Sequence, residues 1–157
     1  MTNIDYSVTL PLAWSVLGET SKTITPRPRP RRGAMEWAIQ FAFEHPGSMG
    51  AILGVTAVSL DMLLNGRDGL AYCMSDRVID GECRRGRLGI HFSNGSQITG
   101  YPSTIRPDRF YGLNINYVLI EQGVANGRAL EALTQQLRPL PGIENCIITI
   151  TDDEADE

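Results

Sequence analysis

Three short runs of almost purely apolar residues constrain the fold of this chain more than any other feature. They cover residues 50–56 (GAILGVT), 116–120 (NYVLI) and 145–151 (NCIITIT). A strand that is apolar along its whole length has both faces buried, which is typical of a parallel sheet with helices on both sides. The runs therefore predict strands in the interior of an α/β domain.

Helical patterns alternate with these runs. The clearest is a stripe of apolar residues over 34–44, which ends before a His-Pro-Gly sequence at residues 45–47. Residues 57–64 and 128–137 are also predicted to be helices, and residues 69–74 are a further candidate strand. Strands that alternate with helices imply right-handed crossovers and a largely parallel sheet.

One antiparallel element interrupts that pattern. Asn94-Gly95 stands between two β-prone stretches, residues 87–92 and 97–100. Asn-Gly tolerates the positive φ angles of a tight hairpin turn, so a β-prone run on each side of it indicates a β-hairpin. The predicted fold class is a three-layer α/β domain with a mostly parallel sheet and one embedded hairpin.

The two ends of the chain differ from this middle part. Residues 1–32 are predicted to form an extended lead-in that ends in an Arg-Pro segment. Alternating prolines cannot sit in a helix or a central strand, so this segment is expected to be an exposed, polyproline-like arm. Residues 33–151 are predicted to form the α/β domain, and the acidic residues 152–157 (DDEADE) are predicted to be disordered.

Composition argues against several classes of protein. The formal net charge of −4 argues against a protein that binds nucleic acid over its whole surface, although it allows a local basic patch. The three cysteines (Cys73, Cys83 and Cys146) lack the spacing of a disulfide framework or a zinc site, and reduced thiols fit a cytoplasmic protein. No stretch approaches the ~20 apolar residues that span a membrane, and the start of the chain is unlike a signal peptide.

Five stretches, taken in order, resemble the ATPase domain of bacteriophage large terminases, the motors that pump DNA into capsids. They are GAMEW at residues 33–37, AILGVT at 51–56, FSNG at 92–95 followed by PDRFYG at 107–112, YVLIEQ at 117–122, and IITIT at 147–151. The resemblance covers roughly residues 27–151. It implies a RecA-like, P-loop-NTPase-like fold, with ATP and Mg²⁺ as ligands at the carboxyl ends of the strands.

The resemblance also assigns candidate residues to a degenerate nucleotide site. They are Lys22, Thr23, Arg31, Arg32, Glu121, Gln122, Thr149 and Thr151. Glu121 and Gln122 take the positions of the Asp and Glu of a Walker B motif, where the first residue supports Mg²⁺ and the second activates water. Glu121 is therefore the expected metal ligand if a nucleotide binds.

The same positions lack the chemistry of a working ATPase. A phosphate loop needs the sequence G-x-x-x-x-G-K-[ST], because its backbone N–H groups wrap the phosphates and its lysine contacts them. This chain has prolines and arginines before Gly33, and its only lysine, Lys22, lies further upstream. Gln122 has no basic oxygen that could take a proton from water. We therefore expect no catalytic residue and no cofactor.

Three functions fit this combination. The first is a non-catalytic, terminase-like protein that binds phage packaging components (the large terminase, the small terminase or the portal) in the host cytoplasm, as one member of an oligomeric ring. The second is an ATP-binding or weakly active packaging ATPase with a remodelled phosphate loop, in which Arg31, Arg32 or Lys22 replaces the missing lysine. The third is a virion accessory protein that contacts DNA or an acidic partner through its arginines. The arginines concerned are Arg27, Arg29, Arg31 and Arg32.

Overall fold

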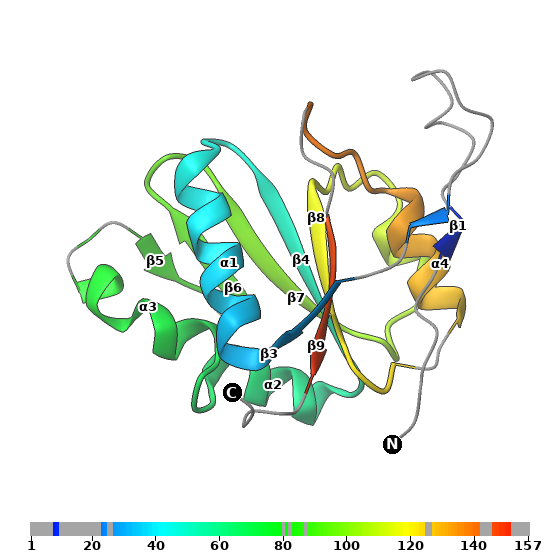
Figure 1. Cartoon of the computed structure of the whole chain (residues 1–157), viewed down its shortest axis with the longest axis horizontal. Helices are drawn as coiled ribbons and strands as arrows, with labels where there is room; N and C mark the ends of the chain where they lie inside the picture. Colours follow the sequence, from blue (N-terminus) through cyan, green and yellow to red (C-terminus); the bar gives the residue numbers. More distant parts are fainter. Residues whose placement is uncertain are drawn as a thin grey trace.

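A seven-stranded mixed sheet forms the centre of the protein, as a computed structural model shows (Figure 1). The structure describes residues 8–9, 23–24, 27–79, 81, 83–86, 88–124, 127–141 and 146–151. The order of strands across the sheet is β3-β9-β8-β4-β7-β6-β5. Their bounds are β3 (Arg27–Pro30), β4 (Met49–Gly54), β5 (Cys83–Arg85), β6 (Gly89–Phe92), β7 (Gln97–Pro102), β8 (Tyr117–Glu121) and β9 (Ile147–Thr151).

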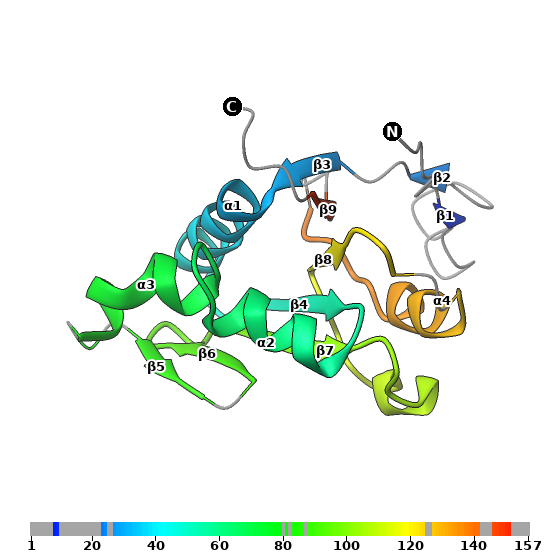
Figure 2. The ribbon, with the colours of Figure 1, turned by 90° about the horizontal axis from the view of Figure 1, so that it is seen from below.

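Helices lie on both faces of this sheet (Figure 2). They are α1 (Arg31–Glu44), α2 (Ala57–Asn65), α3 (Leu70–Ile79), α4 (Gly127–Gln135) and the short 3₁₀ helix η2 (Pro107–Phe110). Two adjacent residues of β7 show which helices share a face: Gly100 faces Leu60 of α2, whereas the ring of Tyr101 packs against Phe110 of η2. Since successive side chains of a strand point to opposite faces, α2 and η2 cover opposite sides of the sheet.

The predicted apolar runs are confirmed as interior strands. β8 lies between β4 and β9 and pairs in parallel with both. The residues of these three strands are buried apart from their ends. A separate two-stranded antiparallel sheet joins β1 (Val8–Thr9) to β2 (Thr23–Ile24).

The predicted hairpin is confirmed, although β6 begins at Gly89 and β7 continues to Pro102. β6 pairs antiparallel with β7 around Asn94-Gly95, where Gly95 has a φ of 92°. β5 adds a third antiparallel strand beside β6. β7 then pairs in parallel with β4, so the hairpin joins the parallel part of the sheet.

The candidate strand at residues 69–74 is wrong, because this segment forms the start of α3. Leu70 and Met74 are both buried, four residues apart, which is the spacing of one face of a helix. Periodicity in so short an apolar run cannot distinguish a strand from a buried helical turn.

The expectation of an exposed polyproline-like arm is wrong for residues 27–30. They form β3, which pairs in parallel with β9 at the edge of the sheet, and α1 begins at Arg31 rather than Ala34. Prolines at positions 28 and 30 place both missing N–H groups on the same side of the strand. An edge strand tolerates proline when that side faces away from its neighbour. The predicted boundary at residue 33 therefore falls inside α1.

The Tyr117 ring of β8 lies over Gly50 of β4. A Cβ atom at this position would lie 2.1 Å from the ring of Tyr117. The Tyr117 hydroxyl donates to the carbonyl of Ala38 in α1 at 3.4 Å, and its ring contacts those of Trp37 and Phe41. Gly50 thus leaves the space in which a buried tyrosine connects the sheet to α1.

The end of α1 is held by the hairpin turn. The Ser96 side chain is completely buried, and its hydroxyl lies 3.0 Å from each of the carbonyl oxygens of Ala42 and His45. The Asn94 side-chain amide donates to the Ala42 carbonyl at 2.8 Å. Carbonyls in the last turn of a helix lack partners within the helix, and these two side chains supply partners for the Ala42 carbonyl. The His45 carbonyl also accepts the backbone N–H of Ser48 at 3.0 Å.

Candidate functional site

The carboxyl ends of the five parallel strands lie along one edge of the sheet. The last residues of β3, β9, β8, β4 and β7 are Pro30, Thr151, Glu121, Gly54 and Pro102. This edge is where an α/β sheet binds its ligands, and most of the candidate residues lie along it. Thr23 does not, because it belongs to β2 of the two-stranded sheet. Lys22 lies outside the described residues.

The junction between β3 and α1 contains no loop. β3 ends at Pro30, which is also the N-cap of α1, and Arg31 is the first helical residue. Gly33 is the third residue of α1, inside its first turn. A phosphate loop holds its anion with several backbone N–H groups between strand and helix, and here the strand passes directly into the helix. The described residues at this junction therefore do not fit a bound triphosphate.

Glu121 is engaged by the turn between β4 and α2. Its Oε1 accepts hydrogen bonds from the backbone N–H of Val55 at 2.8 Å and from the hydroxyl of Ser59 at 2.9 Å. Ser59 also forms a capping box with Thr56 at the start of α2. The Glu121 carboxylate thus links the end of β8 to the first turn of α2, which is a structural role. Within the described residues, no three His, Cys, Asp or Glu side chains could hold a metal ion together.

The remaining candidates at this edge point in different directions. Thr149 and Thr151 lie on the face of β9 opposite to Ile150, and Ile150 pairs with Glu121. The Glu121 side chain therefore lies on one face of the sheet and the two threonines on the other. Thr149 is buried, and its hydroxyl has no hydrogen-bond partner among the described residues. Gln122 is exposed, and its backbone N–H donates to Ile150.

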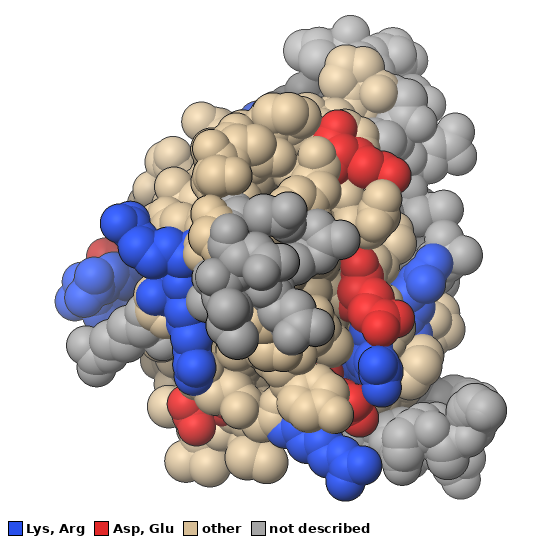
Figure 3. Space-filling model, turned by 90° about the vertical axis from the view of Figure 1, so that its left-hand side faces the viewer, with Lys and Arg blue, Asp and Glu red and all other residues tan. Residues whose placement is uncertain are grey.

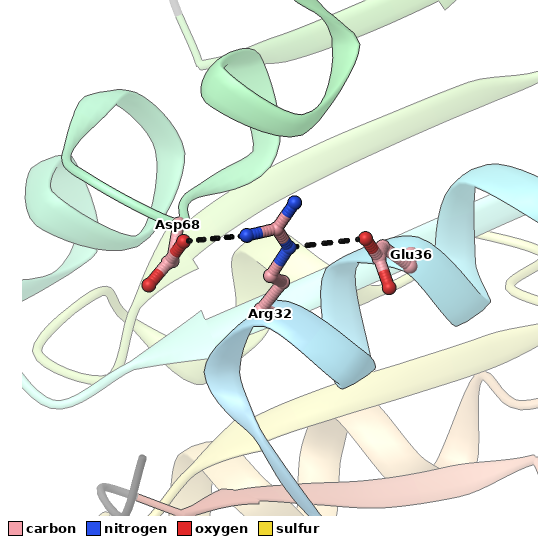
Figure 4. Close-up of polar contacts among 3 residues, drawn as sticks. All are labelled: Arg32, Glu36 and Asp68. Carbon is pink, nitrogen blue, oxygen red and sulfur yellow. Dashed lines mark hydrogen bonds and ion pairs between the residues drawn. The ribbon is translucent and has the colours of Figure 1, made fainter. Parts of the chain in front are cut away.

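Arg32 joins α1 to the turn between α2 and α3. Its Nε lies 3.2 Å from Oε2 of Glu36, and its Nη1 lies 3.8 Å from Oδ1 of Asp68 (Figure 4). Asp68 has a φ of 61°, in the left-handed region that aspartate tolerates better than most residues. Burial, with a smaller contribution from Glu36, raises the pKa of the nearby Cys73 thiol to about 11. The four-residue spacing of Arg32 and Glu36 on a helix is a pattern from which their ion pair could be predicted. The contact of Arg32 with Asp68 has no such local pattern.

The outer side of α2 carries apolar residues that the sequence interpretation missed. Val58 is 76% exposed and Met62 is 50% exposed, one helical turn apart. Beside them, an open hollow of about 320 Å³ lies between α2 and the sheet. It is lined by Ala57, Leu60, Asp61, Leu64, Leu88 and Pro102. Contiguous exposed apolar groups can mark a surface that contacts another protein.

Charged side chains do not form one continuous patch on the face that Figure 3 shows. Basic groups stand in separate places on it, and acidic groups lie between several of them. Arg67, Arg84 and Arg85 are exposed, and a side-chain nitrogen of Arg85 donates to Asn65.

Comparisons with known proteins leave the family open. No model of a known protein family matches this chain, and no curated protein matches it significantly. None of the helices in the described part of the chain is long and apolar enough to span a bilayer.

Proposed function

We propose that this chain is a non-catalytic relative of the ATPase core of phage large terminases, and that it acts by binding other proteins of the DNA-packaging machinery. The observation that carries the proposal is the direct passage of β3 into α1 at Pro30 and Arg31. The resemblance puts the phosphate loop at this point. A domain without that loop has no backbone cradle for the phosphates that the motor splits.

The order of elements supports the same proposal. The five resembling stretches fall on the start of α1, on β4, on the hairpin and η2, on β8, and on β9. All of these strands belong to one sheet, and the strands at the positions of the Walker A and Walker B motifs, β3 and β8, both pair with β9. A P-loop-NTPase-like architecture accounts for this arrangement.

The position of Glu121 supports a change from catalysis to structure. In the motor, the acidic residues after this strand act on Mg²⁺ and water. Here the carboxylate of Glu121 orders the first turn of α2 through Val55 and Ser59. α2 is also the helix whose outer side exposes Val58 and Met62. We infer that this side of α2 contacts the large terminase subunit, since a domain of similar shape can take a neighbouring place in its ring.

Two alternatives remain as outcomes of the test. ATP binding without turnover would draw on Arg31 and Arg32 in the first turn of α1, although Arg32 is paired with Glu36 and Asp68. A virion accessory protein would instead be found in mature particles and would not bind packaging proteins.

The proposal is tested by co-expressing the tagged chain with the large terminase, the small terminase and the portal of the same phage. We expect the large terminase to co-purify, and we expect no Mg²⁺-dependent phosphate release from ATP by the chain alone. Turnover that is lost in Glu121→Ala but not in Glu131→Ala would overturn the proposal. So would the absence of binding to all three packaging proteins.

A further inference from the structure

The hollow beside α2 combines an apolar lining with one carboxylate. Its volume is about 320 Å³, and among the described residues that line it only Asp61 carries a charge. Binding pockets for small molecules usually measure about 300–1,000 Å³, so this open hollow has room for one long side chain rather than for a large organic ligand.

The lining is built by α2 together with β6 and β7. Leu60 and Leu64 of α2 face Gly100 of β7, where a Cβ atom would lie within 3.0 Å of a methyl carbon of each. The carbonyl of Leu88, the residue before β6, accepts the backbone N–H of Gly100 at 2.7 Å. Pro102 is the last residue of β7. Packed elements of the fold therefore shape the hollow.

A row of polar side chains holds Asp61 at the hollow. Its Oδ1 accepts a hydrogen bond from the side-chain amide of Asn65 at 2.9 Å, one helical turn further along α2. The oxygen of the same amide accepts a hydrogen bond from Arg85 of β5, which is not among the residues that line the hollow. Asn65 thus orients the Asp61 carboxylate. A carboxylate can accept several hydrogen bonds, so Asp61 can still accept a further donor.

A side chain that matches this hollow needs an aliphatic stem and a positively charged end. The stem suits the apolar lining, and the charge suits Asp61. Lysine and arginine both have this form, but a guanidinium is more weakly hydrated than an ammonium group and its planar fork matches a carboxylate. Exposed apolar side chains adjoin the hollow, namely Val58, Met62 and Leu88. They can contact apolar neighbours of the incoming residue and exclude water from it.

We propose that the hollow binds an arginine side chain of a partner protein, with the guanidinium on Asp61 and the aliphatic stem against Leu60 and Leu88. This inference rests on the proposed function for the identity of the partner, the large terminase subunit. The hollow itself can be tested without that partner.

A fragment titration tests the hollow. n-Butylguanidinium carries the end of an arginine side chain, and n-butylurea has nearly the same shape without the charge. Each is titrated into the ¹⁵N-labelled full chain while the amide signals are followed. We expect n-butylguanidinium to shift the signals of Leu60, Leu64 and Leu88 and to bind about threefold more tightly than n-butylurea, the size expected of an exposed ion pair. Equal binding of the two fragments, or no shift at these residues, would overturn the proposal.

Matched variants test the role of the carboxylate in that titration. Asp61→Asn keeps an oxygen that can accept the Asn65 amide but removes the charge, so it should abolish the preference for n-butylguanidinium. Glu131→Gln removes the same charge from an exposed position on α4, which packs with η2 on the opposite side of the sheet, and should keep the preference. A preference that survives in Asp61→Asn would overturn the assignment of Asp61.

Co-purification with the large terminase tests the source of the arginine. Asp61→Arg should lower the recovery of the terminase about tenfold, because like charges would then face each other, whereas Glu131→Arg should match the wild type. Equal recovery by the two variants would overturn this inference and leave the proposed function standing. Failure of the wild type to recover the terminase would overturn the proposed function and the choice of partner, and the fragment result would still stand for the hollow.

Discussion

The carboxylate of Glu121, at the end of β8, accepts a hydrogen bond from the backbone N–H of Val55, which follows the last residue of β4, at 2.8 Å. The same oxygen accepts the hydroxyl of Ser59 at 2.9 Å. One carboxylate oxygen at the end of β8 thus forms hydrogen bonds with the residue after β4 and with the first turn of α2. Glu121 is therefore a structural residue of this fold.

Glu121→Ala is expected to destabilise the fold by about 1–3 kcal/mol, because it leaves the Val55 N–H without its partner. Glu121→Gln keeps an oxygen that can accept both hydrogen bonds, so it should cost less than Glu121→Ala. Urea unfolding of the two variants and the wild type measures the difference. Equal losses in both variants would mean that the charge matters more than the hydrogen bonds.

Gly50→Ala is expected to destabilise the fold by about 1–3 kcal/mol, because its methyl group would overlap the Tyr117 ring. The control is Gly127→Ala, where the new methyl group meets no atom within 4 Å and the φ angle is not positive. Combining Gly50→Ala with Tyr117→Leu removes the overlap, so the two substitutions should cost less together than the sum of their separate effects. Strict additivity would count against the overlap as the cause.

Stability is expected to fall as the pH rises from about 9 towards 11. Burial raises the pKa of both Cys73 and Cys146 from the ordinary 9.0 to about 11. The unfolded chain therefore releases these two protons at lower pH than the folded chain. The stabilisation is complete below the unfolded pKa and is lost as the pH approaches the folded pKa. Urea midpoints measured from pH 8 to 10.5 test this, and Cys146→Ala should show a shallower fall than the wild type.

Replacing both prolines of β3 is expected to promote self-association. In Pro28→Val with Pro30→Val, two new N–H groups appear on the side of the edge strand that faces away from β9. Such groups can pair with the edge of another molecule. Sedimentation velocity over a range of concentrations should show dimers or larger species for this variant and not for Arg29→Val. A monomeric double variant would mean that the prolines do not protect this edge.

Under the proposed function, Val58→Ser with Met62→Ser is expected to abolish the proposed co-purification with the large terminase. The melting temperature should change little, because both side chains are exposed. Tyr111→Ser is the matched control, since Tyr111 is 64% exposed and follows η2 on the opposite side of the sheet. Loss of binding in the control alone would move the contact to that side.

The predictable part of the fold is the part whose residues are buried on every side. β4, β8 and β9 are almost wholly apolar, so their sequence alone identifies them. β3 gave no such signal, because its environment is an edge where prolines and arginines are tolerated. The short apolar run at the start of α3 is also ambiguous from sequence, because local periodicity fits a strand as well as a buried helical turn.

The sequence predicts where the candidate site lies, but not which residues its side chains contact. Its place at the carboxyl edge follows from the parallel strands, and Glu121 lies there as expected. Its partners Val55 and Ser59 are 66 and 62 residues away in sequence, so no local pattern announces these hydrogen bonds. The same holds for Arg32 and Asp68, which the α2–α3 turn brings together.

The buried hydroxyl of Ser96 couples two elements that are some fifty residues apart. The last turn of α1 cannot fray into solvent without withdrawing its carbonyls from the hairpin turn, and the turn cannot open without releasing the helix. Amide hydrogens in these two regions should then exchange with deuterium at closely similar rates, as one cooperative unit. The N-terminal end of α1, which has no side-chain cap, should exchange faster and independently.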